Sequence, residues 1–337
     1  MTDEKITTPA IAQDLAEAAA IRRGVIAPEL VPALMVFAAT ALLVIGMKIA
    51  NPSFGSFEQL TAILVTAIFL VVASFGQGLV ILLGGIDLSL GVVIGIGGMM
   101  IADLTRGSND ALLYAIPLTL LSCLGIGLIN GVGVAIAKMP PFIVTLASGI
   151  TFFGVALGFT AGNSQQAVAP ALQQFMSGRL FGIPYPIFFT ALFVLLAWLF
   201  QNRSAEGRKL YAIGSSPGAA RVLGLPIAAL TIVVYAISGL CAGITGILLA
   251  GYSSSATLDM GNALLMPSIA AVVIGGARVT GGSGIYLGTF AGALFLSTLS
   301  TVITTLSLSQ GFRDLVQGGI IIIALLLQQG RLNLRGR

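Results

Sequence analysis

Gly84-Gly85-Ile86-Asp87-Leu88-Ser89-Leu90-Gly91 lies between two long apolar segments, and Asp87 is the only charged residue between Glu58 and Asp103. An Asp at the centre of a membrane helix costs about 2.5 to 3.5 kcal/mol on insertion scales. Paired glycines can interrupt a helix and leave backbone groups free to meet a carboxylate, and Ser89 adds a hydroxyl. We therefore predict a broken, re-entering or membrane-edge turn at 84–91 rather than lipid-facing helix.

The composition around this stretch is that of a membrane protein. Of 337 residues, 57% are hydrophobic and only 8% are charged, whereas a soluble domain carries about 25% charged residues. Apolar runs near 20 residues recur along the chain, which favours an all-α integral membrane protein over a β-barrel. With no histidine and two isolated cysteines, the chain offers no His-based catalysis, no metal site and no cofactor site. The net charge of +4 does not suggest a nucleic-acid partner.

About ten transmembrane helices are expected. The apolar runs lie at 30–50, 59–83, 90–105, 111–137, 142–161, 183–201, 226–252, 263–276, 285–306 and 315–329. They divide the chain into a cytoplasmic N-terminal segment at 1–29 (with a short helix from Thr8 to Gly24), a transmembrane domain at 30–330 and a cytoplasmic basic tail at 331–337. With both termini inside, only four of the 16 Lys and Arg residues face outward: Lys48, Arg106, Arg179 and Arg313. The positive-inside rule therefore predicts N-in and C-in.

A possible internal repeat concerns the glycine pairs. Gly84-Gly85 has a counterpart in Gly275-Gly276 and Gly281-Gly282, about 190 residues later, and each is followed by a glycine-rich helix. Broken helices at matching places suit a two-repeat transporter core. Glycine pairs are common enough in this chain to arise without a repeat, so both readings stay open.

The segment 202–225 is the densest basic cluster and contains a predicted short helix. Ser216 can cap it, Pro217 fits the first helical position, and Gly224-Leu225-Pro226 ends it. A short, rigid helix of this kind suits docking into a groove on a soluble partner. The alternative is an interfacial helix without a partner. The candidate coupling residues are Ser216, Pro217, Gly218, Ala219, Ala220, Arg221 and Gly224.

Three motifs in order carry a family resemblance. They are Gly84-Gly85-Ile86-Asp87-Leu88-Ser89, the loop from Tyr211-Ala212-Ile213-Gly214 through Ala219-Ala220-Arg221 to Gly224, and the run from Ile274-Gly275-Gly276 to Gly284. Together they resemble the membrane permeases of ribose-type sugar ABC importers over about residues 30–330. The resemblance implies ten helices per subunit in a fold related to the vitamin B12-type importers.

The resemblance also implies partners and a function. A second permease subunit (the same chain or a paralogue) would complete the pore. A cytoplasmic ATP-binding subunit would bind the coupling helix, and a periplasmic sugar-binding protein would deliver substrate. The chain would then be the permease subunit of an importer for a monosaccharide or polyol in the bacterial inner membrane, and no enzyme itself. Consistent with this, no Gly-x-x-x-x-Gly-Lys-Ser/Thr nucleotide motif occurs.

Other functions remain open on the sequence. An ABC permease could instead carry a branched amino acid, a nucleoside or a quorum signal. An ion-coupled carrier would need membrane-embedded acids, and Asp87 alone makes a poor proton relay. A non-transporting scaffold would not need a central acid, broken helices and a docking loop.

Three further sets of residues receive roles. As a helix break or gate we assign Gly84, Gly85, Asp87 and Ser89. As pore lining we assign Asn130, Thr145, Thr151 and Phe152, with ordinary helix packing as the alternative. The polar insert 162–182 is expected outside, where Gln173 and Arg179 could contact the binding protein, the alternative being a mobile loop.

Overall fold

The computed structural model describes residues 30–160, 167–309, 311–320 and 322–323, and it is mainly helical. The helices are α2 (Val31–Ala50), α3 (Phe57–Leu82), α4 (Leu90–Thr105), α5 (Leu112–Ala135), α6 (Pro141–Thr160), α7 (Pro170–Ser177), α8 (Tyr185–Trp198), the π-helical η1 (Leu199–Arg203), α9 (Ala205–Ser215), α10 (Pro217–Val222), α11 (Ile227–Ser253), α12 (Asn262–Ile274) and α13 (Tyr286–Thr305). Two short antiparallel strands, β1 (Arg179–Leu180) and β2 (Ile183–Pro184), form a hairpin, with Arg179 opposite Pro184.

Within the described part of the chain, seven helices are long and apolar enough to cross a membrane: α2, α3, α5, α6, α8 with η1, α11 and α13. Helices α4 and α12 have 16 and 13 residues, which at 1.5 Å per residue makes them about 24 and 20 Å long, shorter than a hydrocarbon core of about 30 Å. The first nine expected ranges each correspond to one of these helices. Residues 311–320 and 322–323 are helical. Residues 321 and 324–329 of the tenth range, the expected helix at 8–24 and the basic tail lie outside the described residues.

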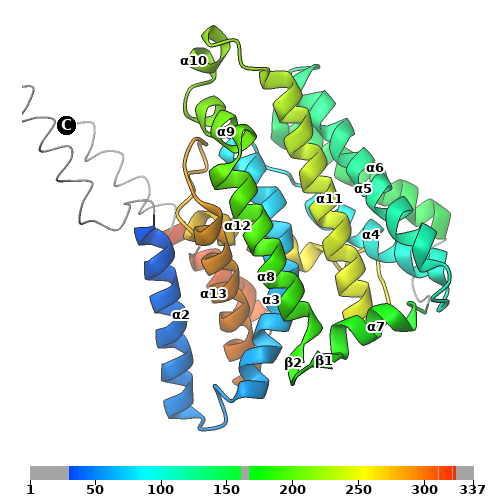
Figure 1. Cartoon of the computed structure of the whole chain (residues 1–337), viewed down its shortest axis with the longest axis vertical. Coiled ribbons are helices and arrows are strands. Elements are labelled where there is room, and N and C mark those ends of the chain that lie inside the picture. Colours follow the sequence, from blue (N-terminus) through cyan, green and yellow to red (C-terminus); the bar gives the residue numbers. More distant parts are fainter. Residues whose placement is uncertain (1–29, 161–166, 310, 321, 324–337) are drawn as a thin grey trace, which may run out of the picture.

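Helix α3 is the centre of the core. Most of its side chains are buried, and it packs against α8, α11, α12 and α13. Helix α11 is the second central element and packs against α3, α4, α5 and α7. Helices α2 and α6 expose most of their apolar side chains and lie at opposite edges of the molecule (Figure 1), which is the pattern expected of helices that meet lipid.

Close helix packing explains part of the glycine content. A Cβ on Gly127 of α5 would overlap the Tyr235 carbonyl oxygen of α11, and a Cβ on Gly239 of α11 would overlap that of Cys123. The two backbones approach this closely because neither helix carries a side chain at the contact.

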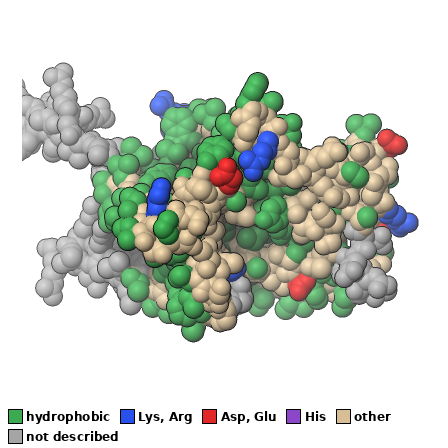
Figure 2. Space-filling model, turned by 90° about the horizontal axis from the view of Figure 1, so that it is seen from below, with side chains coloured by type: hydrophobic (Ala, Val, Ile, Leu, Met, Phe, Trp, Pro, Cys, Tyr) green, Lys and Arg blue, Asp and Glu red, His purple; other side chains and the backbone are tan. Residues whose placement is uncertain are grey.

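The polar elements gather at two opposite ends of the bundle (Figure 1). Helices α9 and α10 occupy one end, here called the α10 end, and α7 with the β1–β2 hairpin occupies the other, the α7 end. Seen toward the α7 end, the surface carries only a few charged side chains among apolar and neutral polar ones (Figure 2).

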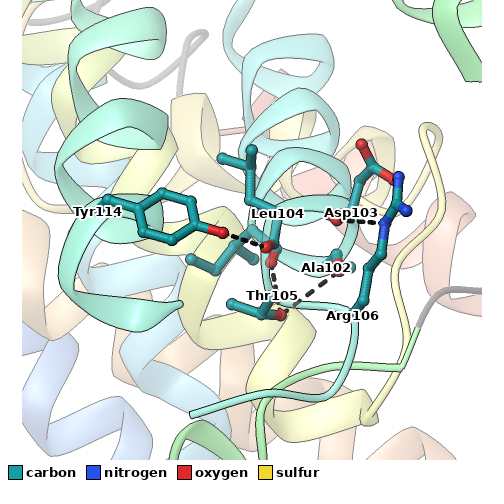
Figure 3. Close-up of polar contacts among 7 residues, drawn as sticks. Ala102, Asp103, Leu104, Thr105, Arg106 and Tyr114 are labelled. Atoms are coloured by element: carbon teal, nitrogen blue, oxygen red, sulfur yellow. Dashed lines mark hydrogen bonds and ion pairs between the residues drawn. The ribbon is translucent and has the colours of Figure 1, made fainter. Parts of the chain in front are cut away.

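Helix α4 terminates in a compact polar turn (Figure 3). Arg106 adopts the left-handed conformation at the C-cap and contacts Asp103 at 3.3 Å, while the Tyr114 hydroxyl of α5 donates to the Leu104 carbonyl at 3.2 Å. The ion pair is largely exposed, so it contributes little to stability, and the turn marks where α4 meets solvent.

Candidate functional site

The predicted helix break is present between α3 and α4. Leu83, Gly84 and Gly85 donate their N–H groups back to Val80 and Ile81 carbonyls at 2.8–3.1 Å, which tightens the last turn of α3. Gly84 then takes a φ of +80°, a conformation that glycine adopts without strain. The chain restarts as a helix at Leu90, so the break lies inside the fold.

Asp87 sits in this break and is 2% exposed. Its Oδ1 accepts from the Ser89 N–H at 3.0 Å and from the Ser89 hydroxyl at 2.6 Å. Its Oδ2 accepts from the Ser238 hydroxyl of α11 at 2.7 Å. The predicted backbone and Ser89 contacts are confirmed, and three donors satisfy a carboxylate that would be unstable in an apolar interior without them.

Gln77, one helical turn before the end of α3, holds the backbone of the same residue. With its amide oriented to match its surroundings, its nitrogen donates to the Asp87 carbonyl at 3.1 Å and its oxygen accepts from the Asp87 N–H at 3.3 Å. Gln77 is fully buried. The side chain and the main chain of Asp87 are therefore fixed by different helices.

Two residues predicted to line a pore belong to this network. Asn130 of α5 donates its Nδ2 to the Ser89 hydroxyl at 2.8 Å. The Thr145 hydroxyl of α6 accepts from the Leu88 N–H at 3.1 Å. Both are fully buried. Helices α3, α5, α6 and α11 thus meet the break through one side chain each: Gln77, Asn130, Thr145 and Ser238.

The other two predicted pore residues lie farther along α6. Thr151 is exposed, and its hydroxyl donates within its own helix to Ala147 at 2.8 Å. Phe152 is half-buried against the apolar cluster of α3, α4, α5 and α11. Thr151 therefore faces away from the network, and Phe152 serves helix packing on one side.

Sequence reasoning missed Gln77 and Ser238. The available signal was their polarity inside otherwise apolar helices. The pattern could not show that Ser238 meets a residue 151 positions earlier.

At the α10 end, the predicted short helix is confirmed as α10. The Ser216 hydroxyl accepts from the Ala219 N–H at 3.3 Å, Pro217 occupies the first position, and Gly224 takes a φ of +70°. Ser216 also ends α9, so no linker separates α9 from α10. Val222 and Leu223 are 89% and 73% exposed and form an apolar tip.

At the α7 end, the described part of the expected polar insert, 167–182, contains α7 and the first strand of the β1–β2 hairpin. Phe181 and Gly182 have φ values of 51° and 82° and close the β1–β2 hairpin in a two-residue turn. Arg179 is exposed and donates to the Gly182 carbonyl at 3.3 Å, and Phe181 is 95% exposed. Gln173 lines a cavity of about 230 Å³ together with Met176, Ser177, Gly251, Tyr252 and Ser254.

Metal ligation has no basis in the described residues, where no three His, Cys, Asp or Glu side chains cluster. Cys123 and Cys241 are buried and unpaired by any disulfide.

Comparisons with known proteins agree on one family. The model of the family described as branched-chain amino acid transport system/permease component matches residues 59–325. The ribose import permease protein RbsC of Bacillus subtilis is 33% identical over 290 residues, 86% of this chain and 90% of that protein. The autoinducer 2 import system permease protein LsrD of Photorhabdus laumondii is 33% identical over 297 residues, 86% and 89% of the two chains. A probable ABC transporter permease protein, y4mJ of Sinorhizobium fredii, is 33% identical over 311 residues, 90% and 91%.

No solved structure matches the chain. The family model nevertheless spans most of the sequence, and the alignments with these relatives cover more than four fifths of it. The matched residues 59–325 include most of the apolar helices described above. The chain therefore belongs to this family of ABC importer permeases, multi-pass inner-membrane transport components that are not enzymes themselves.

Proposed function

We propose that this chain is the transmembrane subunit of an ABC importer for a monosaccharide or polyol, driven by ATP hydrolysis in a separate subunit. The observation that carries the proposal is a capped, solvent-exposed helix with an apolar tip, α10, on a chain 33% identical to a ribose import permease. The proposed arrangement has ten membrane helices in a vitamin B12-importer-like fold, with both termini and α10 in the cytoplasm.

The ATPase subunit would bind α10. Val222 and Leu223 expose apolar side chains next to the basic Arg221, and burying two such side chains in a groove contributes about 1.5–3 kcal/mol each. The residues proposed for coupling are Ser216 through Arg221 and Gly224, of which Ser216 and Gly224 set the two ends of the helix.

A periplasmic binding protein would dock at the α7 end. The hairpin presents Phe181 in a left-handed conformation that is strained for a non-glycine residue, and such strain concentrates at functional positions. Arg179 supplies a positive charge beside it, and Gln173 borders the nearby cavity. We propose that a second permease subunit forms the pore with this one, and that Thr151 on the exposed α6 faces it.

Relatives favour one alternative substrate class. Several are named as autoinducer 2 import permeases, at 33–34% identity, so a quorum signal is the second candidate. The family description adds branched-chain amino acids as a third. Ion-coupled transport needs intramembrane acids. The Asp87 carboxylate accepts its three hydrogen bonds from groups inside the fold, which argues against its use as an ion-coupling site.

The test is uptake by proteoliposomes that contain the permease with its ATPase and binding protein, using radiolabelled ribose, other monosaccharides, autoinducer 2 and leucine in parallel. ATP-dependent uptake of a sugar supports the proposal. Uptake of only leucine or only autoinducer 2 would show that the substrate is an amino acid or a quorum signal rather than a sugar. Uptake driven by an ion gradient without ATP would refute the proposed mechanism.

Matched variants locate the two docking surfaces. Val222→Asp is expected to abolish co-purification of the ATPase, whereas Phe181→Asp, an equally exposed site at the opposite end, should retain it. Arg179→Glu is expected to reduce binding-protein-stimulated ATP hydrolysis, and an unchanged stimulation would show that Arg179 is not part of that interface.

A further inference from the structure

The end of α9 contacts two glycine-containing segments, the break between α3 and α4 and the loop between α12 and α13. Gly214 lies so close to the Leu82 carbonyl, at the end of α3, that a Cβ there would overlap it. The same Cβ would lie 2.6 Å from the Gly282 nitrogen, in the loop between α12 and α13. The Gly282 N–H in turn donates to the Leu82 carbonyl at 2.9 Å. Three chain segments therefore meet backbone to backbone, with no side chain between them.

Side-chain hydrogen bonds also join α9 and η1 to the loop between α12 and α13. The Tyr211 hydroxyl, one turn before Gly214, donates to the Gly284 carbonyl. Gln201 of η1 donates to the Tyr211 oxygen at 2.9 Å and to the same Gly284 carbonyl at 3.3 Å. The loop before α13 is thus held to α9 at both Gly282 and Gly284.

The junction also reaches the first break. A Cβ on Gly84 would lie 3.2 Å from the Thr280 carbonyl oxygen, and one on Gly281 would lie 2.9 Å from the Gly84 nitrogen. Gly84 is three residues from Asp87. The loop 280–284 is therefore clamped between α9 on one side and the break that carries the buried carboxylate on the other.

Rigid contacts of this kind transmit displacement. Helix α9 buries Leu210 and Ile213 in the same core cluster as Leu82, and it continues into α10 through the shared Ser216. Backbone atoms in van der Waals contact cannot absorb a shift by changing rotamer, as long side chains can. We therefore expect a movement of α10 to reach Gly214 through Ser216, and a shift of Gly214 to displace Leu82 and the loop 280–284.

We propose that Tyr211 and Gly214 are positioning residues that carry the motion of the ATPase-docking helix to the Asp87 break. The inference rests on the proposed function, because it needs an ATPase partner on α10. It adds a defined route: α10 to α9, α9 to Leu82 and the loop 280–284, and from both to residues 84–89.

The test uses the complete complex with its ATPase, measured by transport per ATP hydrolysed and by hydrogen exchange of residues 83–90 with and without a non-hydrolysable ATP analogue. Tyr211→Phe removes one hydroxyl at the junction. Tyr114→Phe removes a matched hydroxyl-to-carbonyl bond at the far end of α4 (Figure 3). Gly214→Ala inserts a methyl into the contact, and Gly125→Ala is its control in α5, where no atom lies within 4 Å of the added carbon.

In the wild type and both controls, ATP analogue binding should change exchange at 83–90. In Tyr211→Phe and Gly214→Ala, the ATPase should still bind and hydrolyse ATP, the exchange change should disappear, and transport per ATP should fall about fivefold or more, the lower end of usual coupling effects. A Tyr211→Phe complex with wild-type exchange response and wild-type transport overturns the inference, whether or not Gly214→Ala assembles. A wild-type chain that binds no ATPase overturns the proposed function instead.

Discussion

Replacing Asp87 by alanine tests the account of the buried network most directly. The substitution removes the acceptor for three donors: the Ser89 N–H, the Ser89 hydroxyl and the Ser238 hydroxyl. Each buried donor left without a partner costs about 1–3 kcal/mol. Since the two hydroxyls can rotate toward other acceptors and the N–H cannot, we expect a loss of about 3–5 kcal/mol in the free energy of unfolding.

Asp87→Asn separates geometry from charge. The amide oxygen can still accept both Ser89 donors, but the amide nitrogen now meets Ser238, whose hydroxyl must turn and accept. We therefore expect a loss of about 1–2 kcal/mol, one rearranged hydrogen bond. Thr231→Val on α11 is the matched control, because the Thr231 hydroxyl bonds only within its own helix, to Ile227 at 2.9 Å.

The assay is SDS-induced unfolding of the purified chain in detergent micelles, followed by the fluorescence of its single tryptophan, Trp198. A double-mutant cycle with Ser238→Ala should give a coupling of about 1–3 kcal/mol between the two sites. If Asp87→Ala unfolds like the wild type, or if Asp87→Asn is as unstable as Asp87→Ala, the hydrogen-bond account is wrong.

Three further predictions follow from single contacts. Gly95→Ala places a methyl where it overlaps the Leu258 carbonyl, so it should lower the free energy of unfolding by about 1–3 kcal/mol. Gly125→Ala adds its methyl in open space and should be neutral, so equal SDS midpoints for the two variants would contradict this. Ser216→Ala removes the cap of α10 and should weaken that helix by about 1 kcal/mol, seen as faster amide exchange at Ala219 than in a Ser215→Ala control. Cys123 and Cys241 are buried and should react with a maleimide only after SDS unfolding; labelling of the native protein would disprove their burial.

The helix boundaries could be predicted because apolar length and end signals are local. The Asp87 break followed from an acid next to paired glycines, and α10 followed from Ser216, Pro217 and Gly224. Each of these signals lies within a few residues of the structure it determines. The hairpin was missed because its turn is Phe181-Gly182, which lacks the usual Asn or Asp that marks such turns.

The partners of Asp87 could not be predicted from the sequence. Asn130 and Thr145 are predicted to line a pore because they are polar positions in apolar helices, and that pattern gives polarity without direction. Hydropathy cannot tell a side chain that faces a neighbouring helix from one that faces a channel. Contacts such as Asp87 with Ser238 depend on how α3 and α11 pack, and there Gly76 of α3 lies so close to the Ser238 backbone that a Cβ would be 2.8 Å from the Ser238 Cα.

The direction of the hydrogen bonds explains why a carboxylate suits this position. Asn130 donates to the Ser89 hydroxyl, which must therefore donate onward to Asp87, and Ser238 donates to the other carboxylate oxygen. Only a group that accepts at both oxygens lets both hydroxyls donate. In the proposed cycle this network would have to open each time the permease changes its facing, and water can replace each donor when it does. An apolar contact of similar strength would instead expose hydrocarbon to water at every opening. A network that pairs both oxygens of the Asp87 carboxylate therefore holds the closed state while leaving the open state accessible.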